Sequence, residues 1–103
     1  MKFQTKTILE AGDVSGALAS EVIDMRYNYG FAMQAILTGA PSGDVISQGS
    51  NDQTNWSVID SQAISGTTTI ATNKDGIYWP YVRVIKAGGG TGTMTVTMTI
   101  KGA

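Results

Sequence analysis

The stretch with the most ligand-type side chains is SQGSNDQTNWSVIDSQ, Ser47–Gln62. Asn51, Asp52, Asn55 and Asp60 offer the oxygen atoms that calcium prefers, but the spacing and the bidentate Glu of an EF-hand loop are absent. The same residue types favour turns, because their side chains hydrogen-bond to nearby backbone N–H groups. We therefore expect a turn between two strands here, and no metal site.

The composition argues against an enzyme. The chain has no His and no Cys, so it lacks the side chain best suited to proton transfer near neutral pH and the thiolate nucleophile. No pair of carboxylates stands in a recognisable glycosidase motif. We expect no catalytic residue, no metal and no cofactor.

Aromatic residues form two groups that could make a binding surface. One group lies within Tyr27–Phe31 and the other within Tyr78–Tyr81. Since successive residues of a strand point to opposite faces, about half of these rings should lie in the core. Trp56 follows the polar turn, and closing one end of the core is its expected role. If the protein binds glycans instead, the stacking platform would be Tyr27, Tyr29, Trp56 and Trp79.

Hydrophobic periodicity predicts an all-β chain. In TMTVTMTIKG, Thr93–Gly102, apolar residues alternate with threonines, which is typical of a strand with one buried face. Turn-forming stretches separate the other candidates. Seven to eight short strands result, and they predict an all-β fold, an antiparallel β-sandwich that is jelly-roll-like. The SGALASEVI stretch could alternatively hold one helical turn. The remaining predicted strands are Phe3–Leu9, Ala19–Met25, Phe31–Thr38, Asp44–Gly49, Trp56–Ile59, Thr67–Thr72 and Ile77–Ala87.

The last two predicted strands should form a hairpin. AGGGTG, Ala87–Gly92, separates them and can adopt positive φ angles at little cost. Pro80 has no N–H to donate to a ladder, so the first part of Ile77–Ala87 should lie at a sheet edge or a bulge. We expect Val82 and Val84 to share one core with Met94, Val96, Met98, Ile100 and Trp56.

Length and charge restrict the remaining possibilities. With 103 residues, the chain is expected to be one domain, 1–103. Its formal net charge is −1 with scattered basic residues, so nucleic acid is not an expected partner. The start lacks a continuous apolar segment, and no stretch is long and apolar enough for a membrane span. We expect synthesis in a cytoplasm and no membrane partner.

Two short motifs carry a resemblance to known proteins. SNDQTNWSVI (Ser50–Ile59) followed by YVRV (Tyr81–Val84) resembles the pattern of discoidin-type (coagulation factor 5/8 C-type) β-sandwich domains. The chain resembles more strongly the short β-sandwich virion proteins of tailed phages, in which a Gly-Thr-Gly stretch leads to a terminal strand ending in Lys-Gly. Discoidin-type domains are longer and commonly contain a disulfide, which this chain cannot form.

The resemblance implies a structural virion protein that decorates or cements the outer surface of a phage capsid. The implied partner is the major capsid protein, with a homo-oligomer as a further option, and the implied location is the capsid surface after synthesis in the bacterial host. The alternative is a carbohydrate-binding or adhesion module of a phage tail or a cell surface. A terminal strand can pair across a chain boundary. The expected partner interface is therefore Phe3, Gln4, Thr5, Lys6, Thr7, Ile8 and Leu9.

Overall fold

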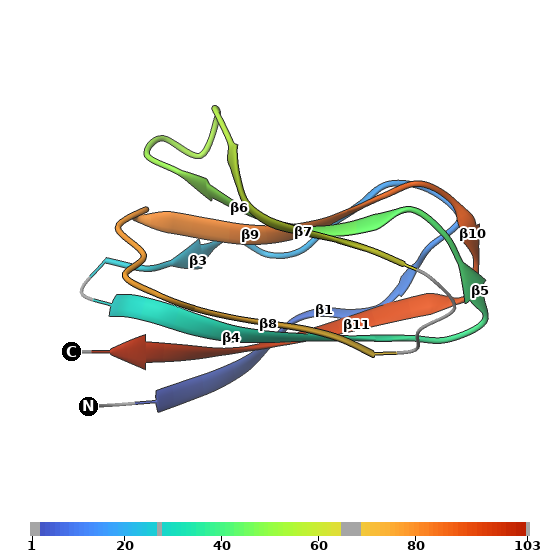
Figure 1. Ribbon diagram of the computed structural model, residues 1–103, viewed down its shortest axis with the longest axis horizontal. Coiled ribbons are helices and arrows are strands. Elements are labelled where there is room, and N and C mark those ends of the chain that lie inside the picture. Colours follow the sequence, from blue (N-terminus) through green and yellow to red (C-terminus); the bar gives the residue numbers. More distant parts are fainter. Residues whose placement is uncertain (1–2, 27, 65–68, 103) are drawn as a thin grey trace.

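The computed structural model describes residues 3–26, 28–64 and 69–102, which form an antiparallel β-sandwich (Figure 1). Sheet A has the strand order β1-β11-β4-β8, and sheet B has the order β2-β9-β6-β7, with β3 also paired to β9. None of the described residues belongs to a helix that could cross a membrane. The strands are β1 (Phe3–Asp13), β2 (Leu18–Ala19), β3 (Ile23–Asp24), β4 (Asn28–Leu37), β5 (Ala40–Pro41), β6 (Asp44–Ser50), β7 (Ser57–Ala63), β8 (Thr69–Asp75), β9 (Tyr81–Ala87), β10 (Gly90–Thr91) and β11 (Thr93–Gly102).

The core lies between the inner faces of the two sheets. In β11 the predicted alternation is confirmed, because Met94, Val96 and Met98 are at most 1% exposed, while the threonines between them are only partly buried. Val82 and Val84 of β9 enter the same core from sheet B. A register slip of β11 by one residue would move Met94, Val96 and Met98 into water, so the buried face fixes the pairing of β11.

The predicted hairpin between β9 and β11 is wrong. The two strands belong to opposite sheets, and the chain crosses between the layers through β10, which pairs with β5 at one end of the sandwich (Figure 1). Gly92 allows this crossing: its φ is +113°, and a Cβ atom there would lie 1.8 Å from the carbonyl oxygen of Thr38. The glycines were correctly associated with positive φ, but they build a crossover between sheets.

Other predicted strands also differ from the structure, and β1 and β7 continue beyond the predicted ends at Leu9 and Ile59 to Asp13 and Ala63. Ala19–Met25 is interrupted, since only β2 and β3 pair with β9. The strand after Gly76 begins at Tyr81, because Pro80 cannot continue the ladder, and β9 then lies inside sheet B rather than at its edge. SGALASEVI forms no helical turn. Thr67 and Thr68, at the start of another predicted strand, lie outside the described residues.

Polar side chains connect β7 to β8 at one open side of the sandwich. Gln62 Nε2 donates to the carbonyl oxygen of Ala71 at 2.8 Å and also to Thr72 Oγ1. The Thr72 hydroxyl in turn donates to Asp60 Oδ2 at 2.9 Å. These bonds join the edge strands of two different sheets. They also give partners to partly buried polar groups, whose burial without a hydrogen bond would be costly.

A buried lysine holds together the end of the sandwich at which β10 pairs with β5. Lys86 of β9 is 1% exposed, and its ammonium group donates to the carbonyl oxygens of Val14 and Gly89, each at 3.1 Å. These two acceptors come from the segments that follow β1 and precede β10. Lys86 therefore links the segment after β1 and the segment before β10 to strand β9 of sheet B.

Candidate functional site

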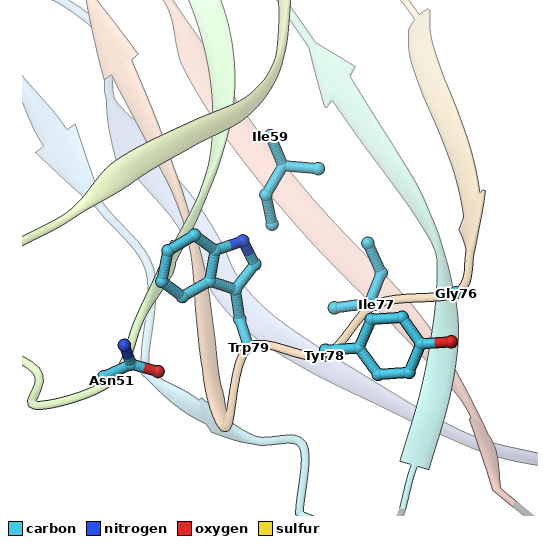
Figure 2. A pocket seen from close by; sticks show the side chains of 6 residues that line it. All are labelled: Asn51, Ile59, Gly76, Ile77, Tyr78 and Trp79. Carbon is cyan, nitrogen blue, oxygen red and sulfur yellow. The ribbon is translucent and has the colours of Figure 1, made fainter.

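A shallow hollow of about 390 Å³ lies at the end of the sandwich where β8 joins β9. Figure 2 shows the side chains that line it, which come from the β6–β7 turn, from β7 and from the β8–β9 connection. No charged side chain is among them. The lining residues are Asn51, Ile59, Gly76, Ile77, Tyr78 and Trp79.

The β8–β9 connection supplies most of this lining through simple alternation. Ile77 and Trp79 are partly buried and pack against the core, whereas Tyr78 between them is 90% exposed. The carbonyl oxygen of Pro80 accepts a hydrogen bond of 2.7 Å from the Met25 backbone N–H, which anchors the end of the connection. The exposed Tyr78 ring therefore belongs to a segment whose backbone is anchored.

Trp79 closes this end of the core. A Cβ atom added to Gly49 would lie 2.3 Å from Cγ of the Trp79 ring, so the indole occupies the space above a glycine of β6. Gly49 pairs with Val82, and both residues are buried on sheet B. The glycine is therefore required for the tryptophan to pack inward.

The polar turn that begins at Ser50 is organised by one carboxylate. Asp52 Oδ1 accepts the Thr54 and Asn55 backbone N–H groups at 2.9 and 2.8 Å, and it also accepts the Ser50 hydroxyl at 2.9 Å. Asn55 Nδ2 donates to Asp52 Oδ2 at 2.9 Å. These hydrogen bonds, those of the Asn55 backbone above all, hold the pKa of Asp52 well below its usual value. The carboxylate is occupied within the turn, as the turn interpretation predicts.

The hollow also presents hydrogen-bonding groups that the protein leaves unused. Among the described residues, neither the Asn51 carboxamide nor the Trp79 indole N–H has a protein partner, and the indole N–H is not sealed from solvent. In Figure 2 the indole nitrogen lies on the side of the ring that faces Ile59. The site therefore combines apolar walls with an unused donor and an unused amide.

The structure describes the rings of Trp56 and Trp79 from the expected aromatic platform, and these two do not share one surface. Trp56 lies on the outer face of sheet B, where its ring stacks on Arg83 with the guanidinium carbon 4.1 Å from the ring centroid. Trp79 packs inward against Gly49. Tyr27 and the side chain of Tyr29 lie outside the described residues. Trp56 is also absent from the core that we predicted for it, because the outward-facing Arg83 provides a competing surface.

The expected partner interface lies on an edge strand. β1 pairs only with β11 in sheet A, and Gln4, Thr5, Lys6 and Thr7 are all exposed. Ile8 is 2% exposed, and its carbonyl oxygen accepts the Glu21 backbone N–H at 2.9 Å. Leu9 packs against the core, and the side chain of Phe3 lies outside the described residues. The open part of the edge thus precedes Ile8.

No group of three or more acidic, His or Cys side chains suited to a metal ion occurs within the described parts of the chain. The sequence did not predict that Asn51, Ile59 and Tyr78 are neighbours. The available signal was the segment between Gly76 and Pro80, in which three large side chains stand between two turn-forming residues.

Comparisons with known proteins identify relatives in structure only. No protein-family model and no curated protein sequence matches the chain. The SPBc2 prophage-derived protein YomS has a similar structure, with a TM-score of 0.75 and 12% identity over 96% of this chain and 92% of YomS. The PBSX exported protein XepA gives 0.77 and 12% over 97% of this chain, which spans only 37% of XepA. A family 29 carbohydrate-binding module is more distant, with a TM-score of 0.51 and 9% identity over 98% of this chain and 89% of the module. At these identities the likeness establishes the fold, an all-β antiparallel sandwich that this chain shares with YomS and with part of XepA.

Proposed function

We propose that this protein is a structural virion protein of a tailed phage that decorates or cements the outer capsid surface. The observation that carries the proposal is the fold likeness to the prophage-derived protein YomS over nearly the full length of both chains. The motif resemblance to short virion β-sandwich proteins points the same way. Such a protein acts as a rigid body with a binding face and performs no catalysis.

The proposed contact is the open edge of β1 between Gln4 and Thr7. Edge strands carry backbone donors and acceptors that a neighbouring chain can complete, and Lys6 adds a charge to this edge. Many weak copies that bind only the assembled shell would stabilise it by mass action, and bridging two capsid subunits would add avidity. The partner is the major capsid protein or a second copy of this chain.

Co-sedimentation with capsids assembled without this protein tests the contact. The parent protein should sediment with the particles, and Thr7→Lys should reduce the bound fraction at least about tenfold, because it places a second charge on the edge. The matched control is Thr69→Lys, which alters an exposed threonine of β8 at the opposite edge of sheet A. Failure of the parent to bind, or equal losses for both variants, would contradict the proposed edge.

The second candidate is a carbohydrate-binding or adhesion module. The fold likeness to a family 29 carbohydrate-binding module and the aromatic hollow at the end of the sandwich favour it. It places the protein where a phage tail or a cell contacts a glycan. Binding of the purified protein to a glycan array would support this candidate, whereas co-sedimentation with capsids supports the first.

A further inference from the structure

We propose that the hollow between the β6–β7 turn and the β8–β9 connection binds one neutral pyranose ring of a glycan. This inference deepens the second candidate function and rests on it, and it does not depend on the capsid role. It assigns the ligand to Tyr78, Trp79 and Asn51, and it excludes Trp56.

The size and the shape of the hollow suit a single small ring. Its volume of about 390 Å³ is at the lower end of the range of roughly 300–1,000 Å³ that is common for ligand sites. It is open to solvent on one side, so a terminal sugar can enter without any movement of the backbone. Neither β7 nor the anchored β8–β9 connection has to rearrange.

The lining combines the two kinds of contact that a sugar requires. The C–H face of a pyranose packs on aromatic or aliphatic side chains, and Tyr78, Ile59 and Ile77 offer such surfaces. Sugar hydroxyls require donors and acceptors at the rim of the same site. The unused Trp79 N–H supplies a donor, and the unused Asn51 carboxamide supplies both a donor and an acceptor.

The backbone segments that carry Asn51, Tyr78 and Trp79 are held in place before a ligand arrives. Asn51 precedes Asp52, whose carboxylate accepts several hydrogen bonds that fix the turn. Trp79 is held over Gly49, and the segment that bears Tyr78 ends at the bond between Met25 and Pro80. Preorganised groups lose little conformational freedom on binding, so even a small ligand can be retained.

The charge around the hollow selects a neutral sugar. None of the lining side chains is charged, and Arg26, on the other side of Tyr78, is paired with Asp24 at 2.5 Å. An acidic sugar would find no counter-charge in the lining. Binding should therefore change little with ionic strength.

The experiment uses the purified full chain and a panel of neutral methyl pyranosides with gluco, galacto, manno and N-acetylglucosamine configurations. Saturation-transfer NMR detects binding, and the background variant Trp56→Phe makes Trp79 the only fluorescent tryptophan. At least one sugar should bind with a Kd of about 1 mM, as is reasonable for a small ligand. Tyr78→Ala should weaken this binding at least about tenfold, and Asn51→Ala several-fold.

The matched control is Val58→Ala. Val58 is an exposed apolar residue, 61% exposed, next to Ile59 but outside the lining of the hollow, and its replacement should leave the Kd unchanged. Absence of binding by every sugar, or binding that Tyr78→Ala does not weaken, overturns the proposal. A second probe, N-acetyl-isoleucine amide, tests the competing occupant: if it binds and the sugars do not, the hollow accepts a protein side chain. Neither negative result affects co-sedimentation with capsids, so the two proposals fail separately.

Discussion

The guanidinium carbon of Arg83 lies 4.1 Å from the centroid of the Trp56 ring, on the outer face of sheet B. Arg83 Nε also donates to Gln48 Oε1 of the neighbouring strand β6 at 2.9 Å, so Gln48 and Trp56 together orient the guanidinium. Trp56 is therefore a surface residue that stacks on a cation, and Trp79 occupies the core position that the sequence analysis assigned to Trp56.

Replacing the two tryptophans by alanine should separate these roles. Trp56→Ala removes a cation–π contact and should lower the free energy of unfolding by about 0.5–1 kcal/mol. Trp79→Ala opens the end of the core and should cost about 3 kcal/mol. Urea denaturation followed by circular dichroism measures both values. Equal losses, or a larger loss for Trp56→Ala, would contradict the assignment.

Gly49→Ala should destabilise the protein by about 1–3 kcal/mol, because the added Cβ meets the Trp79 ring at 2.3 Å and forces it outward. In a Trp56→Phe background the fluorescence maximum should also shift to longer wavelength. Gly16→Ala is the control, since nothing lies within 4 Å of its added Cβ. An unchanged emission spectrum in Gly49→Ala would show that the indole is not held by this glycine.

Lys86→Ala should lower the free energy of unfolding by about 3 kcal/mol, because it leaves a cavity and removes the side-chain donor from the carbonyl oxygens of Val14 and Gly89, of which Gly89 keeps the Ser42 backbone N–H. Lys86→Met keeps most of the volume and removes a buried charge, so its cost should be at least about 1 kcal/mol smaller. Lys6→Ala removes an exposed ion pair of 3.5 Å with Glu21 and should cost less than about 0.5 kcal/mol. A cost for Lys86→Ala as small as that of Lys6→Ala would refute its role as a tie.

Asp52 should make stability depend on acid pH. Its pKa is lower in the folded protein than in the unfolded chain, so its contribution is fully present above the unfolded pKa of about 4 and is lost as the pH falls below it. Thermal unfolding from pH 7 to pH 2 should therefore show a smaller fall in Tm for Asp52→Asn than for the parent. The fall does not disappear, since hydrogen bonds to Ser15 and Arg26 also lower the pKa values of Asp13 and Asp24.

The control for this titration is Thr54→Ala, which changes an exposed neutral side chain of the same turn and keeps the backbone N–H that donates to Asp52. It should leave the acid limb of the Tm profile as in the parent. If Asp52→Asn also leaves that limb unchanged, the carboxylate does not stabilise the turn.

Sequence periodicity predicted the strands but could not predict which sheet each strand joins. The alternation in β11 specifies a buried face, and that face could pack equally well in a hairpin with β9 or across the core from it. The difference depends on Gly92 and on Lys86, whose contacts are made with distant segments. Local patterns do not contain such information.

The candidate site shows the same limit. Asn51 and Ile59 are separated from Tyr78 by about 20 residues or more in the sequence, and only the pairing of β6 with β9 brings them to one end of the sandwich. Trp56 and Trp79 are the same residue type, and their surroundings differ. The Trp56 ring stacks on Arg83, whereas the Trp79 ring packs against Gly49. The turn at Asp52 was predictable because its hydrogen bonds are local.

The proposed virion role predicts that a tailed phage encodes this chain, and its most direct test is cryo-electron microscopy of purified mature particles of such a phage, with mass spectrometry of the same sample. The proposal predicts that the chain is present in many copies and that density for a two-layered β-sandwich lies on the outer capsid surface, with β1 toward the shell. Absence of the chain from mature particles would contradict the virion role, and its presence only on the tail would contradict the capsid assignment.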